Sequence, residues 1–181
     1  LALMLADMKG LLSVKQRRSL IGDIGKVPDL VSTCLNREND VIKVANYLKD
    51  YEHIDNVCYN HTMQIANEGA LKLKEISYMH AEAYPAGEMK HGPIALIDKR
   101  MPVLAIMPKD KWYEKMLSQV EQAKARGGKM IIVATDGDDN VTDIAEEILW
   151  IPQAPWMVNP ILTVVPLQIL AYHIAAMRGL D

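Results

Sequence analysis

Two acidic side chains and a lysine at helical spacing are the clearest candidates for chemistry in this sequence. Glu68, Lys72 and Glu75 follow the pattern i, i+4, i+7, which places them on one face of a helix. A carboxylate beside an ammonium group can move a proton on and off a carbon next to a carbonyl, while the ammonium stabilises the developing oxyanion. This is the chemistry of ketose–aldose interconversion. The same spacing also fits an ordinary solvated Glu–Lys pair, so spacing alone leaves both interpretations open.

A second candidate is the histidine in the segment GEMKHGP, residues 87–93. The glycines on both sides of the histidine permit a tight turn of the backbone. Histidine is also the side chain best suited to move protons at neutral pH. We expect His91 in a loop or short helix, either as a proton shuttle or as a turn residue held by hydrogen bonds. The other histidines have no metal-ligand spacing with Cys34 or Cys58, so the sequence predicts no metal, and it contains no Walker or Rossmann phosphate loop.

Composition excludes several classes of function. The chain has 181 residues with 20 Lys+Arg against 23 Asp+Glu, and this near-neutral balance argues against nucleic acid as a partner. Two cysteines are too few for a disulfide framework and fit a reducing cytoplasm. The most apolar stretch, 160–177, is interrupted by Gln168, His173 and two prolines, so no membrane span is predicted.

The elements that must position these residues alternate between strands and helices after about residue 53. Apolar runs predict strands over 54–59, 103–107, 130–134 and 148–151, with a short strand at 78–82. Helices are predicted over 63–76, 112–126 and 161–177. Such βαβ units imply a parallel sheet covered on both faces, with ligands beyond the carboxyl ends of the strands. The first fifty residues are predicted to be helical, and their role to be linking, packing and contact with a second copy.

Two longer runs resemble a known family. Residues 68–84 (EGALKLKEISYMHAEAY) and 86–98 (AGEMKHGPIALID) closely resemble segments of glutamine–fructose-6-phosphate aminotransferase, the glucosamine-6-phosphate synthase family. The segments 126–128 and 160–173 agree, so the resemblance covers essentially residues 68–181. It implies an α/β fold: a three-layer α/β/α sandwich with a parallel sheet, the flavodoxin-like sugar-isomerase (SIS) domain, preceded by a helical linker.

The resemblance also implies an activity and a domain order. Enzymes of this family carry an amino-terminal glutaminase (glutamine amidotransferase) domain and two SIS domains. They convert fructose 6-phosphate and glutamine into glucosamine 6-phosphate and glutamate, which begins amino-sugar biosynthesis. We therefore expect residues 1–50 to be a helical connector from a first SIS domain outside this sequence. Residues 51–181 would then be the second SIS domain without its C-terminal tail.

Roles for individual residues follow from the same resemblance. It implies that Glu75 is the base that moves a proton between the first and second carbons of the sugar, and that Lys72 acts on oxygens of the open-chain sugar and binds it. Glu68 matches a polar substrate-binding position, and His91 matches a ring-opening histidine supplied by the neighbouring subunit. The implied assembly is a cytoplasmic homodimer with shared active sites and no cofactor. These roles require the Glu75 carboxyl group to face a shared crevice.

Three departures from the family pattern limit this expectation. Residues 58–64 read CYNHTMQ where the family has Gly-Arg-Gly-x-x-Tyr-Pro. The tail lysine that forms a Schiff base with the sugar is outside the sequence, as are the phosphate loop of the first SIS domain and the glutaminase cysteine. We therefore expect the chain alone to be inactive. The alternatives are a non-catalytic sugar-phosphate-binding or dimerisation module, a phosphosugar isomerase or deglycase acting without glutamine, and a purely structural domain.

Overall fold

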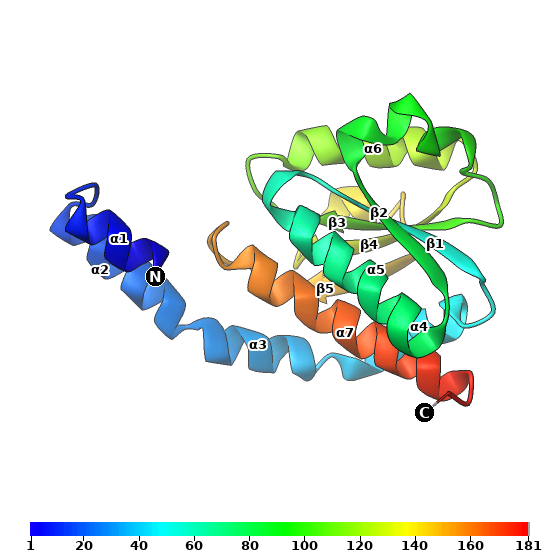
Figure 1. Cartoon of the computed structure of the whole chain (residues 1–181), viewed down its shortest axis with the longest axis horizontal. Helices are drawn as coiled ribbons and strands as arrows, with labels where there is room; N and C mark the ends of the chain where they lie inside the picture. Colours follow the sequence, from blue (N-terminus) through cyan, green and yellow to red (C-terminus); the bar gives the residue numbers. More distant parts are fainter. Residues whose placement is uncertain (181) are drawn as a thin grey trace.

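Five parallel strands form the centre of the computed structural model, which describes residues 1–180 (Figure 1). The strands are β1 (His53–Cys58), β2 (His80–Pro85), β3 (Pro102–Met107), β4 (Lys129–Thr135) and β5 (Glu147–Ile151), in the order β2-β1-β3-β4-β5. All neighbouring pairs are parallel. The four strands predicted from apolar runs are confirmed. The short strand expected at 78–82 lies at 80–85 instead, because Tyr78 adopts a left-handed conformation (φ 54°) that ends the preceding helix.

Helices cover both faces of the sheet, which confirms the predicted three-layer α/β/α sandwich. Helices α4 (Glu38–Leu48), α5 (Met63–Ser77) and α7 (Asn159–Met177) pack on one face, with α3 (Val27–Leu35) against α7. Helix α6 (Tyr113–Ala125) and the short 3₁₀ helices η2 (Ala86–His91) and η3 (Pro93–Ala95) cover the other. Two further 3₁₀ segments, η1 (Asn60–Thr62) and η4 (Asp139–Val141), follow β1 and β4.

Side chains alternate between the two faces along each strand, as a doubly covered sheet requires. The residues directed toward α4, α5 and α7 are Ile54, Leu104, Ile106, Ile131, Val133 and Leu149. Those directed toward α6 are Val57, Val103, Ala105, Met130 and Ile132. Strand order reverses between β1 and β3, because the chain leaves β1 for α5 on one face and β3 for α6 on the other. In sheets of this kind ligands usually bind where the order reverses, beyond the carboxyl ends.

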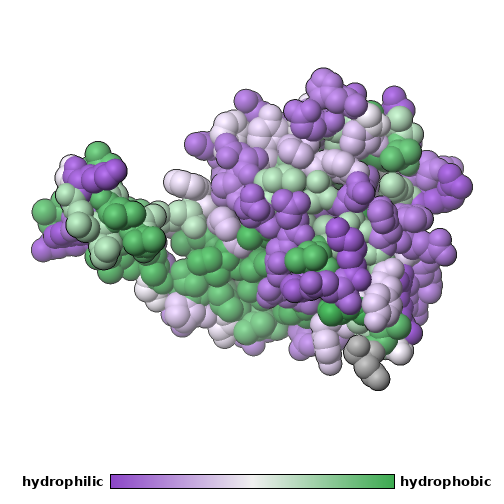
Figure 2. All heavy atoms as spheres, viewed as in Figure 1, coloured by the Kyte–Doolittle hydropathy of each residue, from purple (hydrophilic) through white to green (hydrophobic). Residues whose placement is uncertain are grey.

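An amino-terminal arm extends away from the sandwich (Figure 1). It consists of α1 (Ala2–Met8) and α2 (Val14–Gly25), in which no residue is buried. A capping box begins α2, since Ser13 and Gln16 exchange hydrogen bonds there. Apolar side chains of the arm are exposed, as Figure 2 shows: Leu1, Met4, Leu5, Met8, Leu11, Val14, Ile21 and Ile24. Exposed apolar surface of this extent is typical of sites that contact another protein, a membrane or a ligand.

Helix α7 is the longest helix of the described chain, and most of its residues are apolar. Its mean hydropathy of 1.6 and its 19 residues would suffice to cross a membrane by length and composition alone. However, Leu162, Leu167, Leu170 and Ile174 are buried in the core beside α4 and α5. A core helix of a folded domain passes the same test, and the interior position of α7 accounts for its composition.

Candidate active site

Helix α5 positions the predicted catalytic trio because its opposite face is fixed in the core. Ala66, Gly69, Ala70 and Leu73 are buried against the sheet and α7. At Gly69 a Cβ atom would lie 3.0 Å from Leu167 Cδ1, so even an alanine there would require the Leu167 side chain to move by a few tenths of an ångström. Burial of this stripe turns the remaining face of α5 outward.

The outward face brings Glu68, Lys72 and Glu75 together, as their spacing predicts. Lys72 Nζ lies 2.7 Å from Glu75 Oε2 and 3.9 Å from Glu68 Oε1. The hydrogen bond to the Glu75 carboxylate raises the pKa of Lys72. The lysine is therefore a stable cation placed between two carboxylates. In solvent such pairs add little stability, so the arrangement has no strong structural purpose of its own.

Glu75 lies on an open surface of this chain. Its side chain is 49% exposed, compared with 33% for Lys72. In the part of the chain that the structure describes, the cavities at the two ends of the sheet and beside β5 are lined by other residues. The crevice that the sequence-based hypothesis requires around Glu75 is therefore not among these cavities.

His91 lies on the other side of the sheet from this trio. It is the exposed last residue of η2, which is anchored in the α6-side core by Ala86 and Met89. The following Gly92 has φ 154°, at the edge of the range that only glycine adopts easily, and this fixes the turn after the histidine. Because α5 packs on the opposite face, one chain does not bring His91 and Glu75 into one site.

The crevice at the reversal of strand order is filled by the segment that departs from the family pattern. The Tyr59 ring stacks on Trp112 with 5.4 Å between centroids, and the ammonium of Lys115 lies over both rings. The remaining cavity has a volume of only about 10 Å³. Next to it, His61 Nε2 lies 3.3 Å from Asp110 Oδ2. The pairing of His61 with Asp110 was not predicted from the sequence, because the two residues lie too far apart along the chain for local spacing to connect them.

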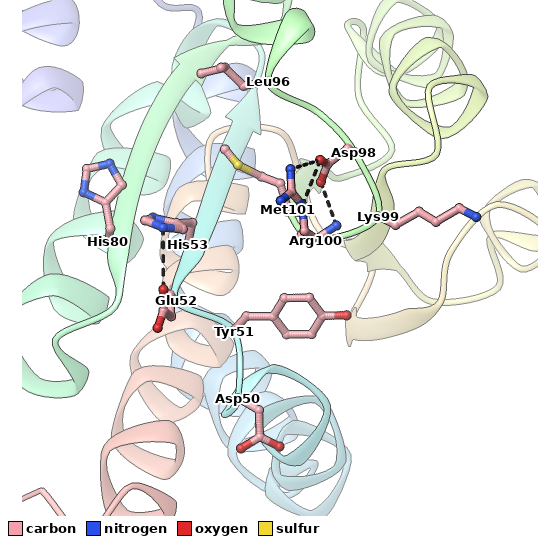
Figure 3. Close-up of a pocket in the computed structure, with 10 residues that line it drawn as sticks. All are labelled: Asp50, Tyr51, Glu52, His53, His80, Leu96, Asp98, Lys99, Arg100 and Met101. Atoms are coloured by element: carbon pink, nitrogen blue, oxygen red, sulfur yellow. Dashed lines mark hydrogen bonds and ion pairs between the residues drawn. The ribbon is translucent and has the colours of Figure 1, made fainter.

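A larger cavity, of about 880 Å³, opens at the amino ends of β1, β2 and β3 (Figure 3). Its rim carries His53 and His80, whose rings meet edge to face at 5.4 Å, and Arg100, which donates two hydrogen bonds to Asp98. Deeper on β1, Asp55 is 5% exposed and faces Glu82 of β2. Burial, reinforced by Glu82, raises the pKa of Asp55 to about 6. No spacing in the sequence signals this cavity.

Residues 1–180 contain neither a cluster suited to a metal ion nor a reactive cysteine. That part of the chain contains no group of three or more His, Cys, Asp or Glu side chains placed to hold a metal ion. Cys34 and Cys58 are buried and not disulfide-bonded. Burial raises the pKa of Cys34 to about 11 and that of Cys58 to about 12, so neither thiol is poised as a nucleophile.

Comparison with known proteins assigns the family. The model of the SIS domain matches residues 52–178. The chain belongs to the SIS domain family. A solved structure with TM-score 0.92 and 37% identity is described as the C-terminal domain of glucosamine-fructose-6-phosphate aminotransferase from Francisella tularensis. The match covers 99% of this chain and 50% of that one.

Curated relatives of this SIS domain carry a consistent name, glutamine–fructose-6-phosphate aminotransferase [isomerizing]. The protein of Aquifex aeolicus is 50% identical over 167 residues, which is 92% of this chain and 28% of that protein. That of Chlorobaculum tepidum is 46% identical over 157 residues, 87% of this chain and 26% of that protein. The chain therefore spans between a quarter and a third of the length of such relatives. The sugar isomerase domain of an RpiR transcription factor from Sphaerobacter thermophilus shares the fold at 11% identity, with TM-score 0.74.

Proposed function

We propose that this SIS domain is the isomerase part of an enzyme that converts fructose 6-phosphate and glutamine into glucosamine 6-phosphate and glutamate. The name shared by the curated relatives supports the reaction. The observation that carries the proposal on this chain is the contact of 2.7 Å between Lys72 Nζ and Glu75 Oε2 on the outward face of α5. The contact supports the proposal because proton transfer at a sugar carbon would use a base with a cation beside it.

In this proposal Glu75 transfers the proton, and Lys72 stabilises the negative charge that forms on an oxygen of the sugar. The Glu75 carboxylate takes a proton from C1 of the open-chain sugar, and the C–H electron pair forms a C1–C2 double bond. The electron pair of the original double bond at C2 then moves to the atom on C2, which is oxygen in fructose 6-phosphate, or nitrogen once ammonia from glutamine has replaced that oxygen and water has left. The same carboxyl group returns the proton to C2 while the C1 hydroxyl loses its proton and becomes the aldehyde, so the aminated sugar becomes the 2-amino aldose. The Lys72 ammonium donates to the oxygen that becomes negative in between, and Glu68 orients that lysine and the sugar hydroxyls.

His91 completes the site from a neighbouring subunit of a homodimer. Support comes from its position in η2, on the face of the sheet opposite α5, where it is exposed and free to contact another molecule. A second copy that presents η2 to the open face of α5 would supply both the ring-opening histidine and part of the missing wall around Glu75. Each subunit would then lend one residue to the site of the other.

The remaining parts of the proposed enzyme lie in other domains. The exposed apolar side chains of α1 and α2 would dock on a preceding SIS domain, which would hold the sugar phosphate. A glutaminase domain would release ammonia from glutamine. A C-terminal tail would supply the lysine that forms a Schiff base with the sugar. The enzyme would work in the cytoplasm, with neither nucleic acid nor membrane as a partner, and the 181-residue chain would be inactive alone.

A second candidate is a non-catalytic module that binds sugar phosphate or forms dimers. The filled crevice between Tyr59 and Trp112 favours it, because a SIS domain that no longer binds a ligand there could persist as a scaffold. Under this alternative the Lys72–Glu75 pair would be only a surface ion pair.

Product formation separates the two candidates. We expect the full-length protein to form glucosamine 6-phosphate from fructose 6-phosphate and glutamine, and residues 1–181 to form none. A full-length protein that binds fructose 6-phosphate without any hydrogen exchange at its first two carbons would instead establish the binding module. The isolated chain needs a circular dichroism spectrum as control, so that inactivity is not mistaken for unfolding.

A further inference from the structure

Arg178 joins the ends of three helices. It is the residue that ends α7, and its guanidinium group donates only to backbone carbonyls. Nε donates to Lys49 O at 2.8 Å, Nη1 to Ser77 O at 2.8 Å and Nη2 to Tyr51 O. Lys49 caps α4 and Ser77 is the last residue of α5. One side chain therefore fastens the ends of α4 and α5 to that of α7.

The end of α5 lacks a backbone hydrogen bond that the ends of the other described α-helices have. Among the seven α-helices of residues 1–180, α5 is the one whose capping residue returns no backbone N–H to its last turn. That capping residue is Tyr78, a non-glycine in the left-handed conformation at φ 54°. Inside the turn, Ser77 Oγ donates to Leu73 O at 2.6 Å. Arg178 donates to a different carbonyl at this end, that of Ser77, and its positive charge is favourable at a helix carboxyl end.

Glu75 stands two residues before the carbonyl that Arg178 holds. The Glu75 side chain leaves the last turn of α5, where frayed backbone would change its direction toward a substrate. Small displacements of a reacting group are costly, because about 1 Å of misplacement can reduce a rate about 100-fold. Leu73, Ser77 and Met79 are buried around this turn, and the Arg178 hydrogen bond to Ser77 O adds a fixed point at its carboxyl end.

We propose that Arg178 is a positioning residue for Glu75, acting through the last turn of α5. The inference rests on the proposed function, since it gives Glu75 the catalytic role. Arg178 has no hydrogen bond to Glu75, Lys72 or Glu68 among the described contacts and is not itself catalytic. It works by holding the carboxylate in the direction from which the sugar proton is taken.

The test compares R178Q and R178K with R126Q in the full-length enzyme. Arg126 is the matched control, because it also caps a helix, α6, and is exposed on the other face of the sheet. The measurement is the steady-state rate of fructose 6-phosphate isomerisation, well below the unfolding temperature of each variant. We expect R178Q to lower kcat about 10-fold or more with KM within about twofold, R178K to lower it less, and R126Q to leave it unchanged.

The outcomes distinguish positioning from stability. A lower unfolding temperature of R178Q with wild-type kcat would show that Arg178 only stabilises the fold and would overturn the inference. If R178Q does not fold, R178K decides: a reduced kcat at unchanged KM supports the inference, and a wild-type kcat overturns it. Should Glu75→Gln retain isomerisation, the proposed function itself fails. If Glu75→Gln abolishes isomerisation and R178Q retains it, only the role of Arg178 fails.

Discussion

Lys72 Nζ contacts Glu75 Oε2 at 2.7 Å on the exposed face of α5, one turn apart on a helix whose other face is buried. The contact joins a base and a cation at a place where the fold gains little from them. Lys72 and Glu75 can therefore be replaced without disturbing the fold. The effect of each replacement on activity can then be measured separately from its effect on stability.

Replacing Lys72 by methionine should separate these effects. We expect Lys72→Met in the full-length enzyme to reduce kcat about 100-fold, because the oxyanion loses its nearest cation. The free energy of unfolding should stay close to that of the wild type, since the ion pair is exposed to solvent. Paired kinetic and urea-unfolding measurements test this, with the exposed neighbour Lys74→Met as control. Equal activity of the two variants would remove Lys72 from the mechanism.

Mixing two inactive variants tests whether sites are shared between subunits. We expect His91→Ala and Glu75→Gln homodimers each to be inactive, and their mixed dimers to have one intact site. Random exchange would restore at most about a quarter of wild-type activity, because half of the dimers would be hybrids with one working site of two. Activity is measured after the subunits are dissociated and reassembled together. Absence of recovery in dimers shown to be hybrid would argue that each site is built from one chain.

The buried carboxyl group of Asp55 predicts a pH-dependent stability. Its pKa is raised to about 6 in the folded chain from 3.8, by burial and by Glu82. The folded state therefore binds the proton more tightly, so unfolding free energy falls as pH rises through about 4 to 6 and stays reduced above. We expect Asp55→Asn to be more stable than wild type at pH 8, by about 1–3 kcal/mol, and equal to it below about pH 4.

Thermal unfolding from pH 4 to pH 8 checks the Asp55 prediction. The exposed aspartate Asp143→Asn is the matched control and should follow the wild-type curve at each pH. A constant difference between Asp55→Asn and wild type over the whole range would mean that Asp55 does not titrate in this window. His53 and His80 lie near enough to lower the pKa of Asp55, so both stay unchanged in the comparison.

Local patterns predicted much of this molecule from its sequence. Apolar runs located the strands and helical spacing placed Lys72 against Glu75, because helix and strand geometry repeat over a few residues. The alternation of elements predicted the parallel sheet covered on both faces. The shift of β2 to residues 80–85 escaped prediction because it depends on the left-handed conformation of Tyr78.

Contacts between residues far apart in the sequence could not be predicted from local patterns. The stacking of Tyr59 on Trp112 and the contact of His61 with Asp110 follow from the order of β1 and β3 in the sheet. The bond from Arg178 to the end of α5 likewise joins residues 101 positions apart. The exposure of Glu75 could not be predicted from local spacing either, since it depends on which other surface packs against α5.

Hydrogen exchange at the sugar carbons tests the role of Glu75 most directly. The full-length enzyme and its Glu75→Gln variant, each with a wild-type circular dichroism spectrum, are incubated with fructose 6-phosphate in deuterium oxide. Nuclear magnetic resonance then follows deuterium at C1 and C2. If the carboxylate is the proton carrier, the wild-type protein labels these positions and the amide variant does not, although it still binds the sugar phosphate. Labelling by the variant at the wild-type rate would contradict this role.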